Sequence, residues 1–142
     1  MSYEEKGTWA YLVAVAGAYA AYLAIILGRL HTAPAAEVSY GWVLLWTTVA
    51  SVAASTLGRT LIETARPSDG RRSDARDAEI YRYGEYASRW FVVSGAAVGF
   101  VLALAKADYF WIANAIYLGF VLWAVAGSVV KIVAYRRGLR LP

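Results

Sequence analysis

The chain contains no cysteine, one histidine and three prolines among its 142 residues. Without cysteine there is no disulfide, no thiolate nucleophile and no thiolate-ligated zinc or iron–sulfur site. The single histidine, His31, lies in a short connection and has no second histidine with which to hold a metal ion. The G-x-S-x-G and H-E-x-x-H patterns of hydrolases and zinc peptidases are also absent. We therefore predict a protein that is not an enzyme and that needs no cofactor.

Acidic and basic side chains are missing from four long apolar stretches, at about 8–27, 38–58, 90–105 and 109–130. Hydrocarbon offers backbone amides no hydrogen-bond partner, so a segment that crosses it must be a helix. About 20 helical residues cover the roughly 30 Å core of a bilayer. We predict one all-α, polytopic membrane domain over 1–142, a bundle of four transmembrane helices. The expected spans are 8–28, 38–60, 87–106 and 109–133, with a partly helical cytoplasmic loop at 61–86.

Basic residues gather on one side of this expected membrane. Lys6, the seven arginines at 59–89 and the four basic residues at 131–140 share that side, which gives it 12 of the 14. Only Arg29 and Lys106 fall on the other side. Loops rich in lysine and arginine stay in the cytoplasm. We therefore expect an integral protein of the plasma (inner) membrane with both termini and the long loop in the cytoplasm.

Small and hydroxyl residues recur at helical spacing inside the spans. Gly95, Gly99 and Ala103 form a four-residue ladder that favours close helix packing, within the chain or across a homodimer. We prefer the packing within the chain. Thr47, Ser51 and Ser55 form a hydroxyl stripe. Its hydroxyls either bond to their own helix, which we favour, or line a wet path.

Two tryptophans, Trp46 and Trp123, lie deep in their spans rather than at the interfaces. The preferred interpretation is that they fill gaps beside the many alanines and glycines. The alternative is a flat pocket for a lipid or quinone tail. Near the outer end of the fourth span, Asn114 is expected to hydrogen-bond between helices rather than to join a polar cluster.

The long loop has two parts. A turn is expected at 66–70, where proline, aspartate and glycine follow one another. From Ser73 a helix is expected to lead directly into the third span, with a capping residue at its start. The seven arginines of the loop are nearly balanced by six acidic residues, so we expect no direct binding of nucleic acid. The candidate partner-binding residues are those of this helix: Arg72, Asp74, Arg76, Asp77, Ile80 and Tyr83.

The sequence D-A-R-D-A-E-I at 74–80 resembles the D-E-R-D-x-x-I signature of a family of small four-span prokaryotic membrane proteins of unknown function. The I-A-N-A sequence at 112–115 and the Y-R-R-G sequence at 135–138 are similar to that family as well. Ala75 stands where the family has glutamate. The resemblance implies a four-helix architecture and pairing with small helix-turn-helix regulators. It implies no activity.

From these observations we predict a non-enzymatic integral membrane protein that acts through protein contacts of its cytoplasmic loop, in a regulatory or accessory role. One alternative is a small oligomeric transporter or channel that uses the hydroxyl stripe. A second alternative is a lipid- or quinone-associated accessory subunit of a larger membrane complex. The expected partners are membrane lipids and a cytoplasmic or membrane protein, and a homo-oligomer stays open.

Overall fold

The structure is a computed structural model that describes residues 3–65 and 75–137. Within these ranges it is all-helical. The elements are α1 (Tyr3–Leu30), the short 3-10 helix η1 (Ala35–Glu37), α2 (Gly41–Ala65), α3 (Ala75–Leu104) and α4 (Tyr109–Arg137). All four α-helices are long and apolar enough to cross a membrane. The prediction of an all-helical protein with four such helices is confirmed.

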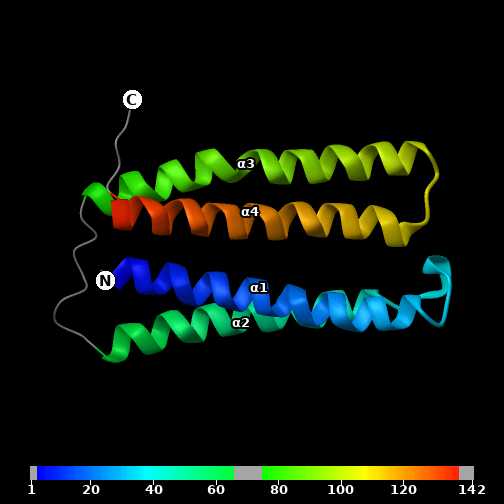
Figure 1. Cartoon of the computed structure of the whole chain (residues 1–142), viewed down its shortest axis with the longest axis horizontal. Helices are drawn as coiled ribbons and strands as arrows, with labels where there is room; N and C mark the ends of the chain where they lie inside the picture. The colour runs from blue at the N-terminus through cyan, green and yellow to red at the C-terminus, as the bar shows by residue number, and fades with distance from the viewer. Residues whose placement is uncertain (1–2, 66–74, 138–142) are drawn as a thin grey trace.

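The four helices run alternately up and down in the spatial order α3, α4, α1, α2 (Figure 1). Helix α4 packs against both α3 and α1, and α2 packs against α1. Within the described ranges, no extensive contact joins α2 to α3 or α4. The bundle is therefore open on one side. We call the end where α1 begins and α4 ends the termini end, and the opposite end the turn end.

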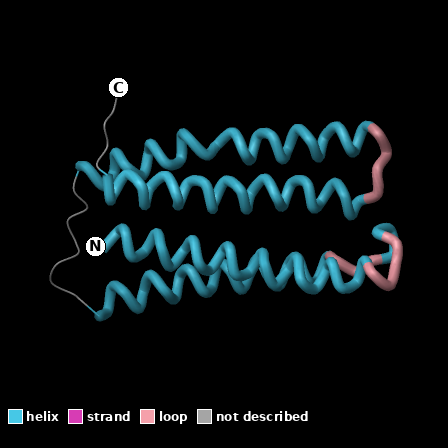
Figure 2. The backbone as a smooth tube through the Cα atoms, in the orientation of Figure 1, coloured by secondary structure: helices cyan, strands magenta, loops and turns pink. Residues whose placement is uncertain are grey.

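Helix α3 has 30 residues. Figure 2 shows it as one unbroken helix. The expected loop helix and the expected third span are thus parts of one helix, about 45 Å long at 1.5 Å per residue. The turn expected at 66–70 and the helix start expected at Ser73 lie outside the described residues. Helix α2 begins at Gly41, because Val38 is extended and buried in the core rather than helical.

The turn between α3 and α4 is set by backbone geometry at Lys106. This residue has a φ of 55°, in the left-handed region that glycine usually occupies. The amide of Ala107 donates to the carbonyl of Leu102 at 2.9 Å, and the amide of Lys106 donates to the carbonyl of Ala103 at 3.0 Å. These two bonds are a Schellman motif, which ends α3 and lets α4 start antiparallel to it.

Helices α3 and α4 meet along a glycine seam, formed by Gly84, Gly95 and Gly99 of α3 and Gly119 and Gly127 of α4. A Cβ atom built at Gly95 would lie 2.6 Å from the Cα of Gly119, and one at Gly119 would lie 2.8 Å from the Cα of Gly95. The two backbones therefore touch. A Cβ at Gly99 would lie 2.7 Å from the Ile116 side chain. The GxxxG sequence thus packs within the chain.

Ala103, the third residue of the expected ladder, is exposed and lies off the seam. The reason is helical geometry, since each four-residue step turns by about 40° more than a full circle. Two such steps carry Ala103 well away from the line on which Gly95 contacts α4. Leu102, seven residues after Gly95, is less exposed than Ala103.

The turn end is closed by an aromatic core. Tyr22 is fully buried, and its hydroxyl donates to Oδ1 of Asn114 at 2.8 Å, a bond between α1 and α4. Tyr117 packs edge-on against the Tyr22 ring, and its hydroxyl lies 3.5 Å from that of Thr47 in α2. Side chains of α1, α2 and α4 therefore meet at this end. Helices α2 and α4 separate toward the termini end.

Candidate functional site

A cleft of about 780 Å³ opens among the four helices at the termini end. Acidic and basic side chains from all four helices line it, and we call it the charged cleft. Its charged residues are Glu4 of α1; Arg59 of α2; Asp77, Arg82 and Glu85 of α3; and Lys131 of α4. The three acids and three bases balance, so the cleft carries no net charge.

An apolar groove of about 530 Å³ continues from this cleft toward the turn end. The charged cleft and the apolar groove share four lining residues, Tyr11, Ser55, Trp123 and Ala124. The groove lies beside α2 between Leu44 and Ser55, opposite Phe120 of α4. Polar side chains are few here, so charge and apolar surface are separated along one continuous path.

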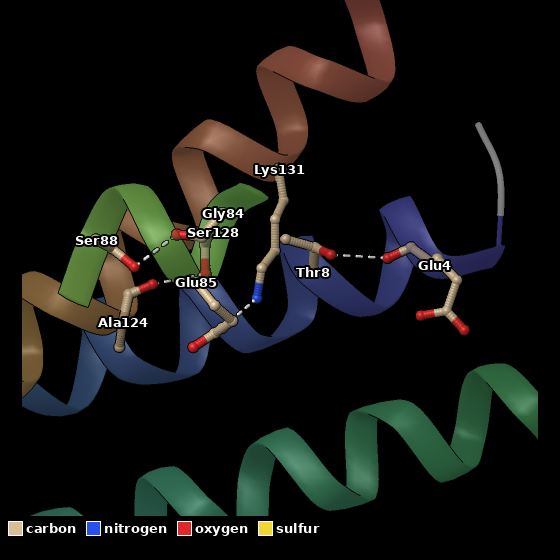
Figure 3. Close-up of polar contacts among 8 residues, drawn as sticks. All are labelled: Glu4, Thr8, Gly84, Glu85, Ser88, Ala124, Ser128 and Lys131. Atoms are coloured by element: carbon tan, nitrogen blue, oxygen red, sulfur yellow. Dashed lines mark hydrogen bonds and ion pairs between the residues drawn. The ribbon is translucent and has the colours of Figure 1, made fainter. Parts of the chain in front are cut away.

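The shortest ion pair of the cleft joins Lys131 to Glu85. Nζ of Lys131 lies 2.7 Å from Oε1 of Glu85 (Figure 3). The same atom lies 4.0 Å from the centre of the Tyr81 ring. The Lys131 side chain is 14% exposed, so its charge is held by these contacts more than by water.

Glycine makes room for that ion pair. A Cβ at Gly84 would lie 2.6 Å from Cγ of Lys131 and 3.1 Å from the carbonyl oxygen of Gly127. Ser88 is also buried, and its hydroxyl donates to the carbonyl of Gly84 at 2.7 Å (Figure 3). The small residues at the start of the seam therefore let the Lys131 side chain cross α3 and reach Glu85.

Two further ion pairs tie α1 to its neighbours at the termini end. Arg59 of α2 lies 3.8 Å from Glu4, and Arg136 of α4 lies 3.3 Å from Glu5. The Glu5 side chain is only 8% exposed. Because a buried carboxylate needs a cation nearby, the Arg136 contact matters more for stability than the exposed Arg59 contact.

Arg82 is the cation of the cleft that forms no ion pair within the described part of the chain. It is exposed and lines both the charged cleft and a neighbouring surface cavity of about 730 Å³. Asp77, on the same helix, shares a hydrogen bond with Tyr135 of α4. The cleft thus holds paired charges on its walls and an unpaired guanidinium at its rim.

The six predicted partner-binding residues differ in where they lie and in how exposed they are. Arg72 and Asp74 lie outside the described residues. Arg76 and Tyr83 are exposed on α3, and Tyr83 is 44% accessible. Ile80 is fully buried, so it cannot contribute to an exposed contact surface. Asp77 faces the charged cleft instead.

The hydroxyl stripe of α2 bonds mainly to its own helix. Thr47 donates to the carbonyl of Val43 at 2.8 Å, and Ser55 donates to that of Val52 at 2.9 Å. Ser51 and Ser55 nevertheless line the apolar groove. Of the two deep tryptophans, Trp46 is exposed and lies outside the groove, whereas Trp123 borders all three cavities.

Sequence reasoning missed Tyr11, Arg82, Glu85 and Lys131 as members of one site. The available signal was Lys131 itself, because a lysine at the end of a long apolar run needs an acidic partner. Glu85 lies 46 positions earlier, and only the packing of α3 on α4 brings it near. Over the ranges 3–65 and 75–137, no three histidine or acidic side chains are grouped to hold a metal ion.

No protein-family model, curated protein or solved structure matches the chain. The resemblance carried by the D-A-R-D-A-E-I sequence therefore stays a prediction, and the interpretation of the site rests on its own residues.

Proposed function

We propose that this is a non-enzymatic integral protein of the plasma (inner) membrane that acts through protein contacts of its cytoplasmic side, in a regulatory or accessory role. The orientation follows from charge. Among the described residues, the termini end carries Lys6, Lys131 and most of the arginines, whereas the turn end carries Arg29 and Lys106. Because lysine and arginine mark the cytoplasmic side, the termini end is the cytoplasmic one.

The observation that carries the proposal is the length and anchoring of α3. At about 45 Å, α3 exceeds the roughly 30 Å hydrocarbon core, so about ten residues extend beyond it. These are its first residues, because Leu104 ends α3 at the turn end. Arg76, Glu79 and Tyr83 are exposed there, while Ile80 and Gly84, on the adjacent side of the helix, are buried against the protein. This rigid, charged surface offers a partner a contact that needs little ordering on binding.

The transporter alternative has less support. A path for ions or polar solutes needs free polar groups at membrane depth. The Thr47 and Ser55 hydroxyls donate to their own helix, and the aromatic core around Tyr22 fills the turn end. Within the described part of the chain, only a few hydroxyl side chains line the groove that continues the charged cleft. The structure of the single chain therefore supports a role in protein contacts better than a role in conducting ions or polar solutes.

Site-specific photo-crosslinking in cells tests the proposal. A photoreactive amino acid in place of Tyr83 should give discrete protein adducts, and these should disappear when Arg76→Ala is added. The same amino acid in place of Val98, which is exposed at mid-membrane depth, is the matched control and should not give them. Identical adducts at both positions, or none at position 83, would refute a contact surface on α3.

Reporter fusions test the orientation separately. Fusions after Pro34 and after Ala107, both at the turn end, should report an extracytoplasmic position. A fusion after Arg137 should report a cytoplasmic one. A cytoplasmic signal at Pro34 would reverse the assignment and remove the cytoplasmic contact surface.

A further inference from the structure

The charged cleft and the apolar groove form one continuous path, as their shared residues Tyr11, Ser55, Trp123 and Ala124 demonstrate. We propose that this path binds one phospholipid of the cytoplasmic leaflet, with the headgroup phosphate at Arg82 and an acyl chain in the apolar groove. The inference does not depend on the partner contacts of α3. Volumes of about 780 and 530 Å³ lie within the range of small-molecule binding sites.

The depth of the path fits a lipid better than a protein helix. Helix α2 lines the two cavities from Leu44 to Arg59, which corresponds to a rise of about 23 Å. One leaflet with its headgroup region is about 20–22 Å thick, half of a bilayer of about 40–45 Å. The contact between Thr47 and Tyr117 narrows the gap between α2 and α4 near the deep end of the groove. A transmembrane helix of a partner would need a groove along the whole core of about 30 Å, whereas a lipid occupies one leaflet.

The open side of the bundle gives a lipid its entry. Helix α2 packs on α1 and makes no extensive contact with α3 or α4 within the described ranges. The path is therefore open laterally, toward the hydrocarbon from which an acyl chain would enter. Trp123 and Phe120 of α4 supply apolar surface opposite Val52 of α2.

Charge places the phosphate at one residue rather than over the whole cleft. The six charged residues of the cleft cancel, so no net field attracts an anion. Lys131 already contacts Glu85 at 2.7 Å, and Arg59 is near Glu4. Arg82 is exposed at the rim and has no ion pair within the described residues. A guanidinium binds phosphate through paired N–H groups, so Arg82 is the residue fitted to the headgroup.

Native mass spectrometry of the full chain in mild detergent, titrated with phosphatidylglycerol, tests this site. Arg82→Ala should weaken the binding constant of the first lipid about tenfold, the effect of losing one charge-assisted hydrogen bond. Arg137→Ala removes a similarly exposed arginine at the same end, outside all three cavities, and should change the constant less than about twofold on that basis. Diacylglycerol, which lacks phosphate, should bind wild type and Arg82→Ala equally weakly.

A second pair of variants tests the groove. Ser55→Trp should fill the neck that joins the cleft to the groove and should abolish retention of the first lipid. Ser94→Trp places the same side chain at an exposed position of α3 outside the cavities and should retain the first lipid.

The proposal is overturned if Arg82→Ala and Arg137→Ala weaken binding equally, because lipid association is then a general surface effect. It is equally overturned if folded Ser55→Trp keeps its lipid, or if a protein segment and no lipid occupies the wild-type cleft. Should Ser55→Trp fail to fold, the two arginine variants decide the question.

Discussion

The glycine seam allows a stability prediction with an internal control. A Cβ atom at Gly95 would lie 2.6 Å from the Cα of Gly119 and 3.1 Å from the carbonyl oxygen of Ala115. Both are backbone atoms, so Gly95→Ala can be accommodated only if α3 and α4 separate. Overpacking of this kind costs about 1–3 kcal/mol. Alanine also favours a helix by up to about 1 kcal/mol over glycine, so we expect a net loss of up to about 2 kcal/mol.

Gly17→Ala isolates the helix preference, because nothing lies within 4 Å of a Cβ built at Gly17. In thermal unfolding followed by circular dichroism in detergent, Gly17→Ala should melt at or above the wild-type temperature. Gly95→Ala should melt below it. Gly99→Ala should fall between the two, since its nearest neighbour is the flexible Ile116 side chain. Equal melting of Gly95→Ala and Gly17→Ala would refute the backbone contact between α3 and α4.

Three further predictions concern single contacts. Lys106→Gly should stabilise the protein by about 0.5–1 kcal/mol, because glycine accepts the left-handed φ of 55° without strain; an unchanged melting temperature would argue against that geometry. Glu85→Gln should cost about 1–3 kcal/mol by leaving the largely buried Lys131 charge unpaired, and Glu85→Gln with Lys131→Met should recover most of the loss in the same melting assay. Tyr22→Phe should cost about 1–2 kcal/mol, measured by urea unfolding, because it leaves the half-buried amide oxygen of Asn114 without its 2.8 Å partner; wild-type stability would show that water replaces the bond.

The helices themselves could be predicted from the sequence because helix formation is local. Each backbone amide bonds four residues back, and a long run without charge leaves no other way to cross hydrocarbon. The helical pattern from Ser73 into the third span predicted a continuous helix, and α3 runs unbroken from Ala75. The side on which most basic residues lie could likewise be read from the order of loops and spans.

The contacts of the helices could not be predicted in the same way, because they join residues far apart in the chain. The GxxxG sequence indicated close packing but did not identify Gly119 as the opposing surface. The drift of about 40° per four residues placed Gly95 and Gly99 on the seam and Ala103 off it. Rotation about the same helix axis buries Ile80 and leaves Tyr83 exposed.

The candidate site depends even more on tertiary structure. Six charges from four helices were visible in the sequence only as separate loop and tail residues. Packing of α3 on α4 pairs Glu85 with Lys131, and the separation of α2 from α4 beyond Thr47 opens the cleft beside Arg82. Hydropathy and charge order therefore determined how many helices form and which ends they share. Which faces meet, and where they leave a gap, was decided by side-chain fit between helices distant in sequence.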